Sequence, residues 1–350
     1  MKVLVIGATG FIGPHVVREL QRLGHAVAVF HRGTSTASWS GVGSIIGDRR
    51  NLNQHEEAFR RFAPDLVIDM ILSSGPQAET LMQVFRGVAR RAVAISSMDV
   101  YRAFGIFHGT EPGPLQPLPV TEESAIRQNL HPYPAEVLKR VQSVFGWVDD
   151  AYDKIPVERA VLGNAELPAT VLRLPMVYGP GDPLHRFFPV LKRMRDGRKK
   201  ILFSEEVAVW RSPRGYVENV ALAITLAACS DHAAGKIYNV AEEPAFSELE
   251  WAQKIAREVG WRGDFVVLPR ERMPKHLLLP GNFKQHGTAS SAKIREELGF
   301  HERVPLSDAI RHTVAWELAN PPAQISAQQF DYPAEDAAIG EGTAACLTID

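Results

Sequence analysis

The start of the chain alternates between short apolar runs and a stretch with helical periodicity. Residues 3–6 form a continuous apolar run rich in β-branched side chains, which is typical of a buried parallel strand. Apolar residues then recur at the spacing of one helix face, at Ile12, Val16, Val17, Leu20 and Leu23. Gly24 ends that pattern, and residues 26–30 form a second apolar run. This order predicts a strand, a helix and a second strand, the βαβ unit of a parallel sheet.

The same alternation continues along the chain. Strands are predicted over residues 66–72, 92–95 and 170–174, and helices over residues 54–62 and 78–89. Strands and helices that alternate at this spacing are typical of α/β proteins. We therefore expect a doubly wound parallel sheet with helices on both faces.

Residues 105–134 interrupt the alternation. They include Gly113 and six prolines and show little helical period, so we expect a long loop or insertion. Loops of this length inside a compact domain are usually functional or mobile. Helices are predicted after this segment, over residues 135–148 and 155–162.

The composition changes in the second half of the chain. The predicted elements there are helices over residues 187–194 and 247–259, a helix that ends at residue 228, and a strand over residues 236–240. Ser247 is followed three residues later by Glu250, the signature of a capping box. Residues 320–350 are rich in Ala, Gln and acidic side chains, and we expect them to form a loosely attached tail.

The overall composition is that of an ordinary globular protein. The 350 residues suggest two domains, and 45% hydrophobic and 23% charged residues argue against a disordered chain. A net charge of −1 provides no strong field for nucleic acid or an anionic membrane. The only cysteines, Cys229 and Cys346, make no disulfide framework, which favours a reducing compartment. No apolar stretch approaches the roughly 20 residues that span a bilayer, and the run after Lys2 lacks a signal-peptide cleavage site. We therefore expect a soluble, cytoplasmic protein without a membrane partner.

Three glycines follow the first strand and open the first helix. Gly7 permits a tight turn, Gly10 lets backbone N–H groups approach a pyrophosphate, and Gly13 lets helix and strand pack closely. The N-terminus of the helix adds a favourable dipole and free N–H donors. The spacing G-x-x-G-x-x-G differs from the usual G-x-G-x-x-G, but its strand–turn–helix context predicts a dinucleotide site.

The end of the second strand bears on which dinucleotide binds. A site for NAD has a carboxylate about 20 residues beyond the glycines, which accepts a hydrogen bond from the ribose 2′-hydroxyl. This chain has His31 and Arg32 there and no carboxylate. A guanidinium suits a 2′-phosphate, so we expect NADP. NAD is the alternative, if Arg32 is only a solvated loop residue.

These residues resemble the signature of a known family. Residues 7–13, with Phe11 and Ile12 between the glycines, look like the extended short-chain dehydrogenase/reductase superfamily, in its NAD-dependent epimerase/dehydratase group. Asp48, in a Gly-Asp-Arg sequence, resembles the third-strand aspartate that contacts the adenine in that family. The resemblance covers residues 1–315, and the absent ribose carboxylate places the chain nearer to the atypical members.

The resemblance implies a Rossmann domain with a smaller C-terminal substrate lobe. The Rossmann domain would comprise residues 1–179 and 214–242, the lobe residues 180–213 and 243–315, and the tail residues 316–350. The implied cofactor-binding residues are Gly7, Thr9, Gly10, Phe11, Ile12, Gly13, His31, Arg32, Asp48, Arg49, Ile71, Leu72, Ser96, Lys154, Pro175 and Val177. A homodimer is compatible with the resemblance.

Ser97 is the first candidate for catalysis. It follows the strand over residues 92–95, and the crevice of a doubly wound sheet lies at the carboxyl ends of its strands. It also precedes Tyr101 by four residues, as the family's catalytic Ser or Thr does, where it would bond the reacting oxygen. The alternative is a turn in which Ser96 and Ser97 satisfy their own backbone.

In the family, an acid/base tyrosine is followed four residues later by a lysine. This sequence contains no such Y-x-x-x-K pattern. In the family that lysine bonds the nicotinamide ribose and lowers the tyrosine pKa from about 10. Lys154 and Glu158 resemble the family's K-x-x-x-E, and on that register Asp150 stands where the tyrosine belongs.

Tyr152 is the nearest tyrosine, two residues before Lys154. The two side chains would diverge on a regular helix, but Pro156 disfavours regular helix just before it. A distorted entry would let Tyr152 move the proton while Lys154 holds the ribose and lowers the tyrosine pKa. The alternatives for the proton donor are Asp150, Tyr133 or no residue at all.

Three arginines are candidates for binding the substrate. Arg186, Arg211 and Arg214 lie where the family gathers groups for the substrate's phosphates, and a planar guanidinium suits a phosphate. Solvated surface arginines are the alternative. The scattered histidines and cysteines do not have the spacing of a metal site, so we expect no metal.

Two hypotheses about function follow. The first is an NAD(P)-dependent oxidoreductase of the epimerase/dehydratase type, acting on a hydroxyl- or carbonyl-bearing small molecule, with a sugar nucleotide among the candidates. The second is a nucleotide-binding protein that retains the fold without catalysis, or that associates with RNA. The missing Y-x-x-x-K motif favours the second hypothesis, whereas the net charge of −1 makes nucleic acid an unfavourable partner.

Overall fold

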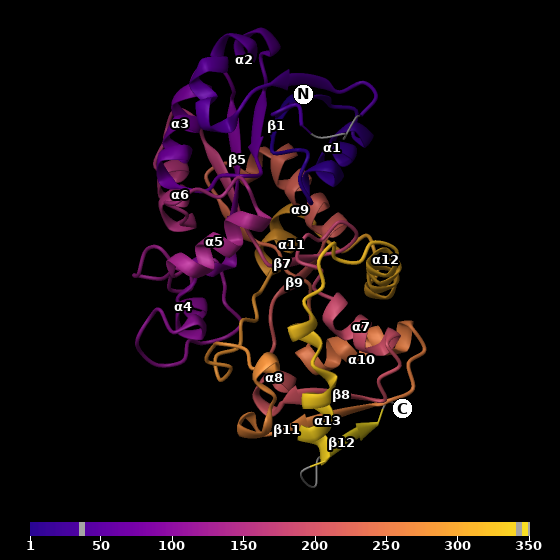
Figure 1. The fold of residues 1–350 in the computed structure, drawn as a ribbon. Helices are drawn as coiled ribbons and strands as arrows, with labels where there is room; N and C mark the ends of the chain where they lie inside the picture. The colour runs from indigo at the N-terminus through magenta and orange to yellow at the C-terminus, as the bar shows by residue number, and fades with distance from the viewer. Residues whose placement is uncertain (35–38, 341–344, 349–350) are drawn as a thin grey trace.

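The computed structural model describes residues 1–34, 39–340 and 345–348. Its main sheet has seven strands, all parallel, in the order β10-β6-β5-β4-β1-β2-β3. Figure 1 labels β1 and β5 of this sheet, in the upper half of the view. The strands are β1 (Lys2–Ile6), β2 (Ala26–His31), β3 (Gly43–Ile46), β4 (Leu66–Asp69), β5 (Arg91–Ser97), β6 (Ala169–Leu174) and β10 (Ile237–Asn239). The strand order reverses between β1 and β4, and a doubly wound sheet binds its ligand at this switch point. The predicted Rossmann architecture is confirmed.

Helices cover both faces of this sheet. One face packs against α1 (Gly13–Arg22) and α9 (Val217–Cys229). The other face packs against α2 (Glu56–Phe62), α3 (Gly75–Phe85) and α6 (Lys154–Leu162). In β1, Val3 and Val5 enter the first core, whereas Leu4 and Ile6 enter the second. A strand buried on both sides needs an apolar residue at every position, which explains the continuous apolar run.

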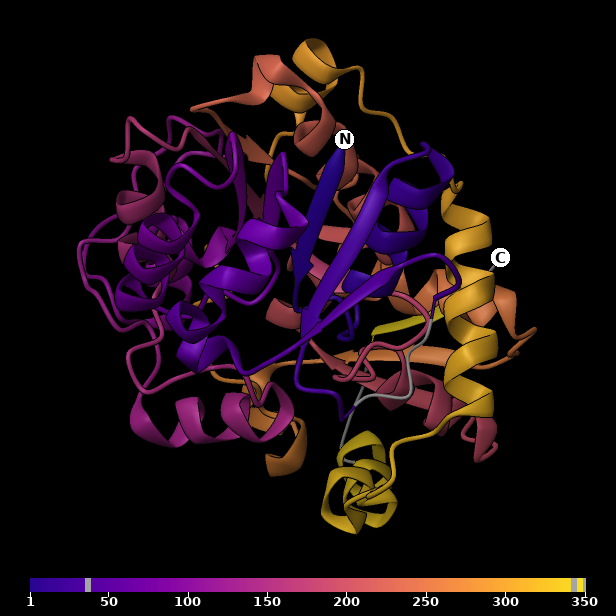
Figure 2. The same cartoon turned by 90° about the horizontal axis from the view of Figure 1, so that it is seen from above.

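The proline-rich segment differs in part from the expected loop. Its start is helical, because α4 (Arg102–His108) ends only at Gly109, which has φ +71°. Residues 109–134 then form a long connection, which touches neighbours through isolated β-bridges. The next helix, α5 (Ala135–Val144), ends earlier than residue 148 and buries none of its residues. Figure 2 shows α5 at the edge of the molecule.

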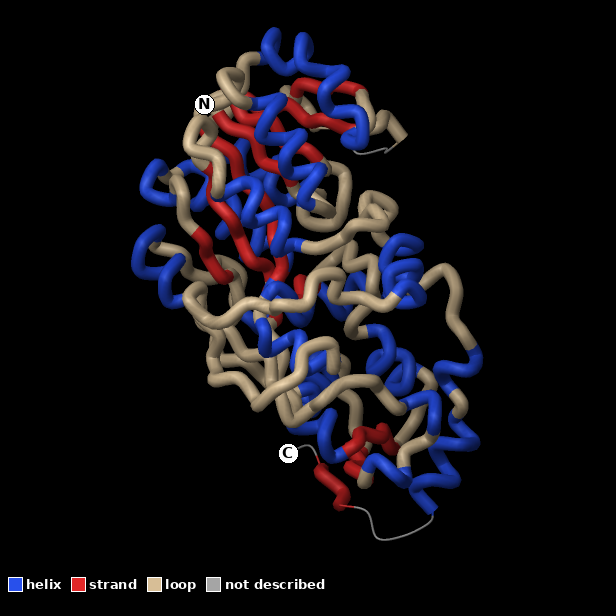
Figure 3. Tube along the Cα trace, turned by 90° about the vertical axis from the view of Figure 1, so that its left-hand side faces the viewer, coloured by secondary structure: helices blue, strands red, loops and turns tan. Residues whose placement is uncertain are grey.

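Two short strands connect the sheet to the lobe. They are β7 (Met176–Tyr178) and β9 (Arg214–Tyr216), which pair in parallel. The lobe has its own three-stranded sheet, in the order β12-β11-β8, at the opposite end of the molecule (Figure 3). Its elements are α7 (Phe188–Arg195), β8 (Lys200–Ser204), α8 (Glu205–Val209), α10 (Glu248–Glu258), β11 (Asp264–Leu268) and β12 (Ala345–Thr348). The predicted capping box of Ser247 and Glu250 is present at the start of α10.

The end of the chain is attached more closely than its composition suggested. The last helices are α11 (Ala292–Leu298), α12 (Leu306–Ala319) and α13 (Tyr332–Gly340). Glu335 of α13 is fully buried and pairs with Arg193 of α7 at 2.5 Å, and β12 then pairs with β11. Short helical turns occupy Arg49–His55, Met98–Val100, Asp231–Ala233, Arg270–Arg272, Lys275–Leu277 and Ala327–Phe330. Of the helices that the structure describes, none has the length and apolarity to cross a bilayer.

Candidate active site

The glycine loop joins β1 to α1 at the switch point of the sheet. Gly7 has φ +81°, and a Cβ there would lie 2.6 Å from the side chain of Ile71. A Cβ at Gly13 would lie 2.5 Å from the carbonyl oxygen of Ala8, so both positions require glycine. At Gly10 the nearest described atom to an added Cβ is the Gly7 carbonyl oxygen, 3.7 Å away, so this position faces open space.

The N-terminus of α1 is available to an anion. Its N-cap is Ile12, whose apolar side chain accepts no hydrogen bond from the helix, and Pro14 occupies the first turn. Thr9 and Phe11 complete the loop, and the Phe11 ring lies 3.5 Å from the position of a Cβ on Gly181. Fixed glycines, open space and an uncapped helix dipole fit the pyrophosphate of a dinucleotide.

The predicted adenosine end lies beyond β2 and β3. His31 Nε2 contacts Ser44 Oγ at 2.8 Å, and the adjacent Arg32 is exposed. Asp48 follows β3, and hydrogen bonds from Arg50 lower the pKa of its carboxyl to about 2. At neutral pH this end therefore presents an exposed guanidinium beside an ionised carboxylate.

Arg49 has a different role from the predicted cofactor contact. Its guanidinium is buried, and Nη2 donates to Asp69 Oδ2 at 2.9 Å and to the Gln77 carbonyl oxygen at 3.0 Å. The side chain thereby joins the end of β4 to α3. A fully buried carboxylate such as Asp69 needs a cation or hydrogen-bond donors, and Arg49 supplies them.

Ser97 and Asp99 lie together at the carboxyl end of β5. Ser97 Oγ accepts a hydrogen bond from the Asp99 N–H at 3.2 Å. Asp99 is 8% exposed, and its Oδ1 is buried with no hydrogen-bond partner among the described residues. Burial raises the pKa of Asp99, and the charge of Arg127 opposes this shift. The site therefore holds a carboxyl that binds a proton more tightly than it would in water.

Two tyrosines donate to the other oxygen of Asp99. Asp99 Oδ2 accepts from the hydroxyl of Tyr133 at 3.1 Å and from that of Tyr152 at 3.3 Å. The two rings stack with centroids 5.6 Å apart. Burial and the charge of Asp99 raise the pKa of both phenols well above the usual value of about 10. Both side chains are therefore neutral hydroxyls at physiological pH.

The backbone just ahead of α6 is irregular at Asp153, whereas Ile155, the residue that Pro156 was expected to keep out of helical conformation, lies inside the helix. Asp153 is extended, with φ −163° and ψ 131°, and its side chain caps the helix by accepting from the Ile155 N–H. Tyr152 therefore lies outside the helix that Lys154 begins. The Lys154 Nζ lies 5.7 Å from the centroid of the Tyr152 ring, so the two side chains share one environment.

Lys154 bonds to the backbone. Its Nζ donates to the carbonyl oxygens of Leu72 and, at 3.1 Å, of Ile95, and it lies 5.2 Å from the centroid of the Trp147 ring. Burial lowers the pKa of Lys154 to about 8. We expected Lys154 to lower the pKa of Tyr152, but burial and the Asp99 charge raise it. One of the three N–H groups of Lys154 has no acceptor among the described residues.

Two other predicted residues lie outside this group. Asp150, which stands at the family's tyrosine position, is exposed and accepts a hydrogen bond from Gln142 at 2.9 Å. Ser96 Oγ donates to Glu158 Oε1 at 2.5 Å, and Glu158 also pairs with Arg173 at 2.7 Å. Ser96 therefore belongs to a buried network beneath the site.

The segments that lead into the lobe carry the remaining candidates. The Pro175 ring lies 3.0 Å from the position of a Cβ on Gly215, and the Val177 carbonyl oxygen accepts from Arg186 at 2.8 Å. Arg186, Arg211 and Arg214 each form an ion pair with a carboxylate. Within the described part of the chain, no three His, Cys, Asp or Glu side chains gather as a metal site requires.

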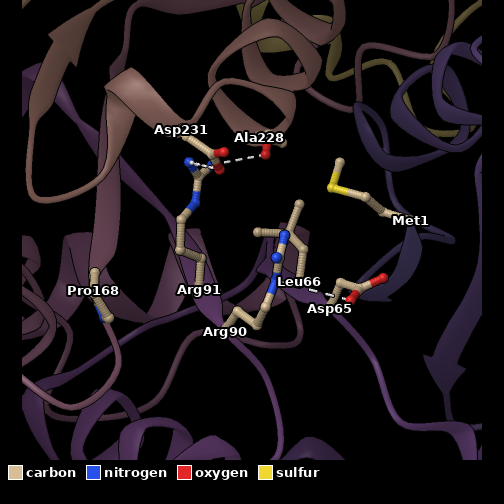
Figure 4. A pocket seen from close by; sticks show the side chains of 8 residues that line it. All are labelled: Met1, Asp65, Leu66, Arg90, Arg91, Pro168, Ala228 and Asp231. Carbon is tan, nitrogen blue, oxygen red and sulfur yellow. Dashed lines mark hydrogen bonds and ion pairs between the residues drawn. The ribbon is translucent and has the colours of Figure 1, made fainter.

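A hollow of about 250 Å³ lies at the opposite edge of the sheet, at the amino ends of its strands (Figure 4). It is lined by Met1, Asp65, Leu66, Arg90, Arg91, Pro168, Ala228 and Asp231. Arg91 donates there to the carbonyl oxygens of Ala227 and Ala228, at 3.0 and 2.7 Å, near the end of α9. The hollow contains none of the predicted site residues, and one of its two arginines, Arg91, caps a helix.

Sequence reasoning did not single out Asp99 and gave Tyr133 only as an alternative. One signal was available for Asp99, which follows Ser97 by two residues at the same strand end. Tyr133 lies in the proline-rich connection, and no local pattern predicts where its side chain points.

Comparisons with known proteins bear on this geometry. Residues 3–241 match the model of the NAD dependent epimerase/dehydratase family. A UDP-N-acetyl-α-D-glucosaminuronate decarboxylase from Bacillus cytotoxicus is 24% identical over 342 residues, which cover 89% of this chain and 96% of the relative. A 2′-dehydrokanamycin reductase from Streptomyces kanamyceticus is 27% identical over 279 residues, which cover 77% of this chain and 70% of the relative.

Solved structures share the fold. A complex of MoeE5 with UDP-glucuronic acid and NAD has a TM-score of 0.65 at 22% identity and covers 91% of this chain and 99% of its own. A UDP-glucose 4-epimerase from Thermus thermophilus in complex with NAD has a TM-score of 0.59 at 24% identity. The match covers 90% of this chain and 98% of the epimerase chain. At these identities the likeness concerns the architecture.

Proposed function

Because the chain belongs to the NAD dependent epimerase/dehydratase family, we propose that it is an NAD(P)-dependent oxidoreductase with Asp99 at its catalytic centre. One observation supports this proposal above the others: the hydroxyl groups of Tyr133 and Tyr152 donate hydrogen bonds to the buried carboxyl of Asp99. Ser97 contacts Asp99, and Lys154 lies beside the Tyr152 ring. A buried acid with a raised pKa and an unpaired oxygen, at the carboxyl end of a strand, is typical of a functional site.

A nicotinamide dinucleotide suits the switch point of the sheet. The glycine loop would hold the pyrophosphate, Asp48 the adenine, and Arg32 the 2′-phosphate of NADP, which we propose as the cofactor over NAD. Lys154 would hold the nicotinamide ribose, and Pro175 would contact the nicotinamide through its backbone. A bound nicotinamide supplies hydride exchange with the substrate carbon, which no side chain supplies.

Asp99 and Tyr152 would handle the proton. In the oxidation of a substrate hydroxyl, its proton passes to the Tyr152 oxygen as Tyr152 gives its own proton to Asp99 Oδ2. Reduction of a carbonyl reverses both transfers. Because burial raises the pKa of the Tyr152 phenol well above its usual value, Tyr152 stays neutral and passes its proton on. Burial also raises the pKa of the Asp99 carboxyl, which makes Asp99 a better proton acceptor than an ordinary carboxylate. Ser97 would hydrogen-bond the same substrate oxygen.

The substrate we propose is a sugar or a sugar derivative with a reacting hydroxyl or carbonyl group. The names of two relatives support this class, since one is a decarboxylase of a UDP-linked sugar acid and another is a 2′-dehydrokanamycin reductase. A protein that only bound a nucleotide, or that associated with RNA, would have no need for the Asp99 group. We therefore do not favour the non-catalytic alternative.

A crystal structure with NADPH tests the proposal. We expect Lys154 Nζ within about 3 Å of a nicotinamide ribose hydroxyl, and the C4 face of the nicotinamide toward Tyr152 and Ser97. A cofactor whose nicotinamide lies away from Asp99 would contradict the proposed mechanism. Failure of NADPH and NADH to bind in solution would contradict the cofactor assignment as well.

A further inference from the structure

Three arginines on the segments that join the sheet to the lobe are each neutralised within the chain. The sequence assigned Arg186, Arg211 and Arg214 to the phosphates of a substrate. Each guanidinium instead lies within 3 Å of a carboxylate oxygen of a neighbouring residue. One relative is a decarboxylase of a UDP-linked sugar acid, and UDP carries two phosphates. The pairing therefore bears on whether the substrate of this protein also carries phosphates.

Arg214 is the least exposed of the three. Its Nη2 lies 2.7 and 2.6 Å from the two carboxylate oxygens of Glu248, and its guanidinium carbon lies 4.7 Å from the centroid of the Trp251 ring. The Arg214 side chain is 7% exposed. Its Nε has no hydrogen-bond partner among the described residues, but the charge of the guanidinium is already neutralised by Glu248, so a phosphate would have to compete with that carboxylate. Arg214 therefore links β9 to α10.

The other two arginines are also engaged. Arg186 Nη1 donates to Asp182 Oδ1 at 2.6 Å and to the Val177 carbonyl oxygen at 2.8 Å. Arg211 Nη1 lies 2.9 Å from Glu250 Oε2 and donates to a backbone carbonyl at 2.6 Å. Both guanidinium groups therefore already have an anionic partner and a neutral one.

A fourth carboxyl, Glu242, lies beside the same connecting strands. Its oxygens accept from the hydroxyl of Tyr178, at 3.1 Å for Oε2, and from the Tyr216 N–H at 2.9 Å. The segments that join the sheet to the lobe, together with α10, therefore bring three guanidinium groups near four carboxyl groups. These are Glu242 and the three partners of the arginines, Asp182, Glu250 and Glu248. It offers a diphosphate no excess positive charge.

A row of aromatic side chains runs from the reactive carboxyl to the lobe. Beyond the stacked pair of Tyr152 and Tyr133, His108 lies 6.3 Å from Tyr133 and 4.9 Å from Phe107, between ring centroids. Phe107 stacks on Trp210, after α8 of the lobe, at 4.6 Å. Trp210 packs in the core against Phe107 and Phe283, whereas Tyr133 and Phe107 are half-buried and His108 is exposed. The middle of the row therefore reaches the surface, where aromatic faces and a few polar groups can hold a small ligand.

We propose that the substrate is a sugar or cyclitol derivative without a phosphate group, bound along the part of the aromatic row from Tyr133 to Phe107. The inference rests on the proposed function, because it concerns the same site. The paired arginines serve to hold the connecting strands and α10 together. The reacting hydroxyl or carbonyl would lie at the Asp99 end of the row, and the rest of the ring system would extend toward the lobe.

Isothermal titration calorimetry of the full-length protein, saturated with NADPH, tests the inference. UDP and UDP-glucose should give no saturable binding up to about 1 mM. A dissociation constant of about 100 μM or lower for either probe would overturn the inference and leave the proposed function intact. Failure of NADPH itself to bind would instead contradict the proposed function.

A double variant, Glu248→Gln with Glu250→Gln, supplies the converse test. It removes the negative charge beside Arg214 and Arg211, and Gln at position 250 can still close the capping box with Ser247. We expect its affinity for UDP to exceed that of wild type by about tenfold or more. Glu297→Gln, which unpairs Lys236 elsewhere, is the control and should gain nothing. A double variant that keeps its NADPH affinity but gains none for UDP would show that the ion pairs of Arg211 and Arg214 are not what excludes a phosphate, which overturns the inference.

Discussion

The hydroxyl of Tyr152 donates to Asp99 Oδ2 at 3.3 Å, across a separation of 53 residues. Tyr133 donates to the same oxygen and stacks on Tyr152. The three side chains come from the end of β5, the proline-rich connection and the residues before α6. The proposed mechanism therefore depends on Asp99 and does not require a phenolate that Lys154 stabilises.

Gly10→Val should abolish dinucleotide binding while the protein stays folded. The structure has room for a Cβ at this position, but the side chain would occupy the space of the pyrophosphate. Fluorescence titration with NADPH measures the effect. Gly340→Val, at an exposed position with no described atom near an added Cβ, should bind normally. Equal affinity in Gly10→Val and wild type would remove the glycine loop from the site.

NADPH should bind more tightly than NADH, and Arg32→Ala should reduce the difference. Arg32 is exposed at the end of β2, and a charged hydrogen bond to the 2′-phosphate contributes about 1.5–3 kcal/mol. Calorimetry with both cofactors checks this value. Arg61→Ala, which removes an exposed arginine of α2, is the control. Equal binding of NADH and NADPH by wild type would mean that Arg32 points elsewhere.

Asp99→Asn should reduce turnover about 10²–10⁴-fold without reducing stability. Burial raises the pKa of Asp99, so the folded protein holds this proton more tightly than the unfolded chain does. The wild type therefore loses stability as the pH rises from about 4 through the raised pKa, whereas Asn does not titrate. The Tm of the variant, relative to wild type, should rise over this pH range in thermal unfolding. A lower Tm at pH 7 would mean that Arg127 stabilises the ionised carboxylate.

Tyr152→Phe should also reduce turnover by about 10²–10⁴-fold, with little change in cofactor affinity. It removes the hydroxyl that relays the proton to Asp99 and retains the stacked ring. Steady-state kinetics beside NADPH titration separates the two effects. Tyr133→Phe is the matched comparison, because it removes the other donor to the same oxygen. If Tyr133→Phe had the larger effect on turnover, the relay would run through the proline-rich connection.

The ammonium of Lys154 should control cofactor affinity at alkaline pH. Burial lowers its pKa to about 8, so Lys154 loses its charge as the pH rises through that value. kcat/KM for NADPH, which reports the free enzyme, should therefore fall above about pH 8. In Lys154→Arg the charge persists, and the fall should move to much higher pH. The same alkaline profile in both proteins would show that another group titrates there.

Much of the nucleotide domain could be predicted because its signals are local. The β1 run, the three glycines and the α1 face lie within 22 residues, and each has a period or a turn requirement of its own. A helix start just ahead of Pro156 was also predictable, because the first turn of a helix tolerates a proline, and α6 indeed begins at Lys154. Element ends were less accurate: α5 ends at Val144, not at residue 148, since exposed helices have no buried contact that sets their length.

The fold class, the glycine loop and the place of Ser97 at a strand end follow from local patterns in the amino-acid sequence. Three contacts of the site do not: Asp99 binds two phenols, Lys154 bonds to two backbone carbonyls, and Arg214 pairs with Glu248. They depend on the packing of distant segments, because burial and charges from those segments set the partners and the pKa of a side chain. Periodicity and motif spacing report on neighbours along the chain, whereas these contacts arise when β5, the proline-rich connection and the lobe pack together.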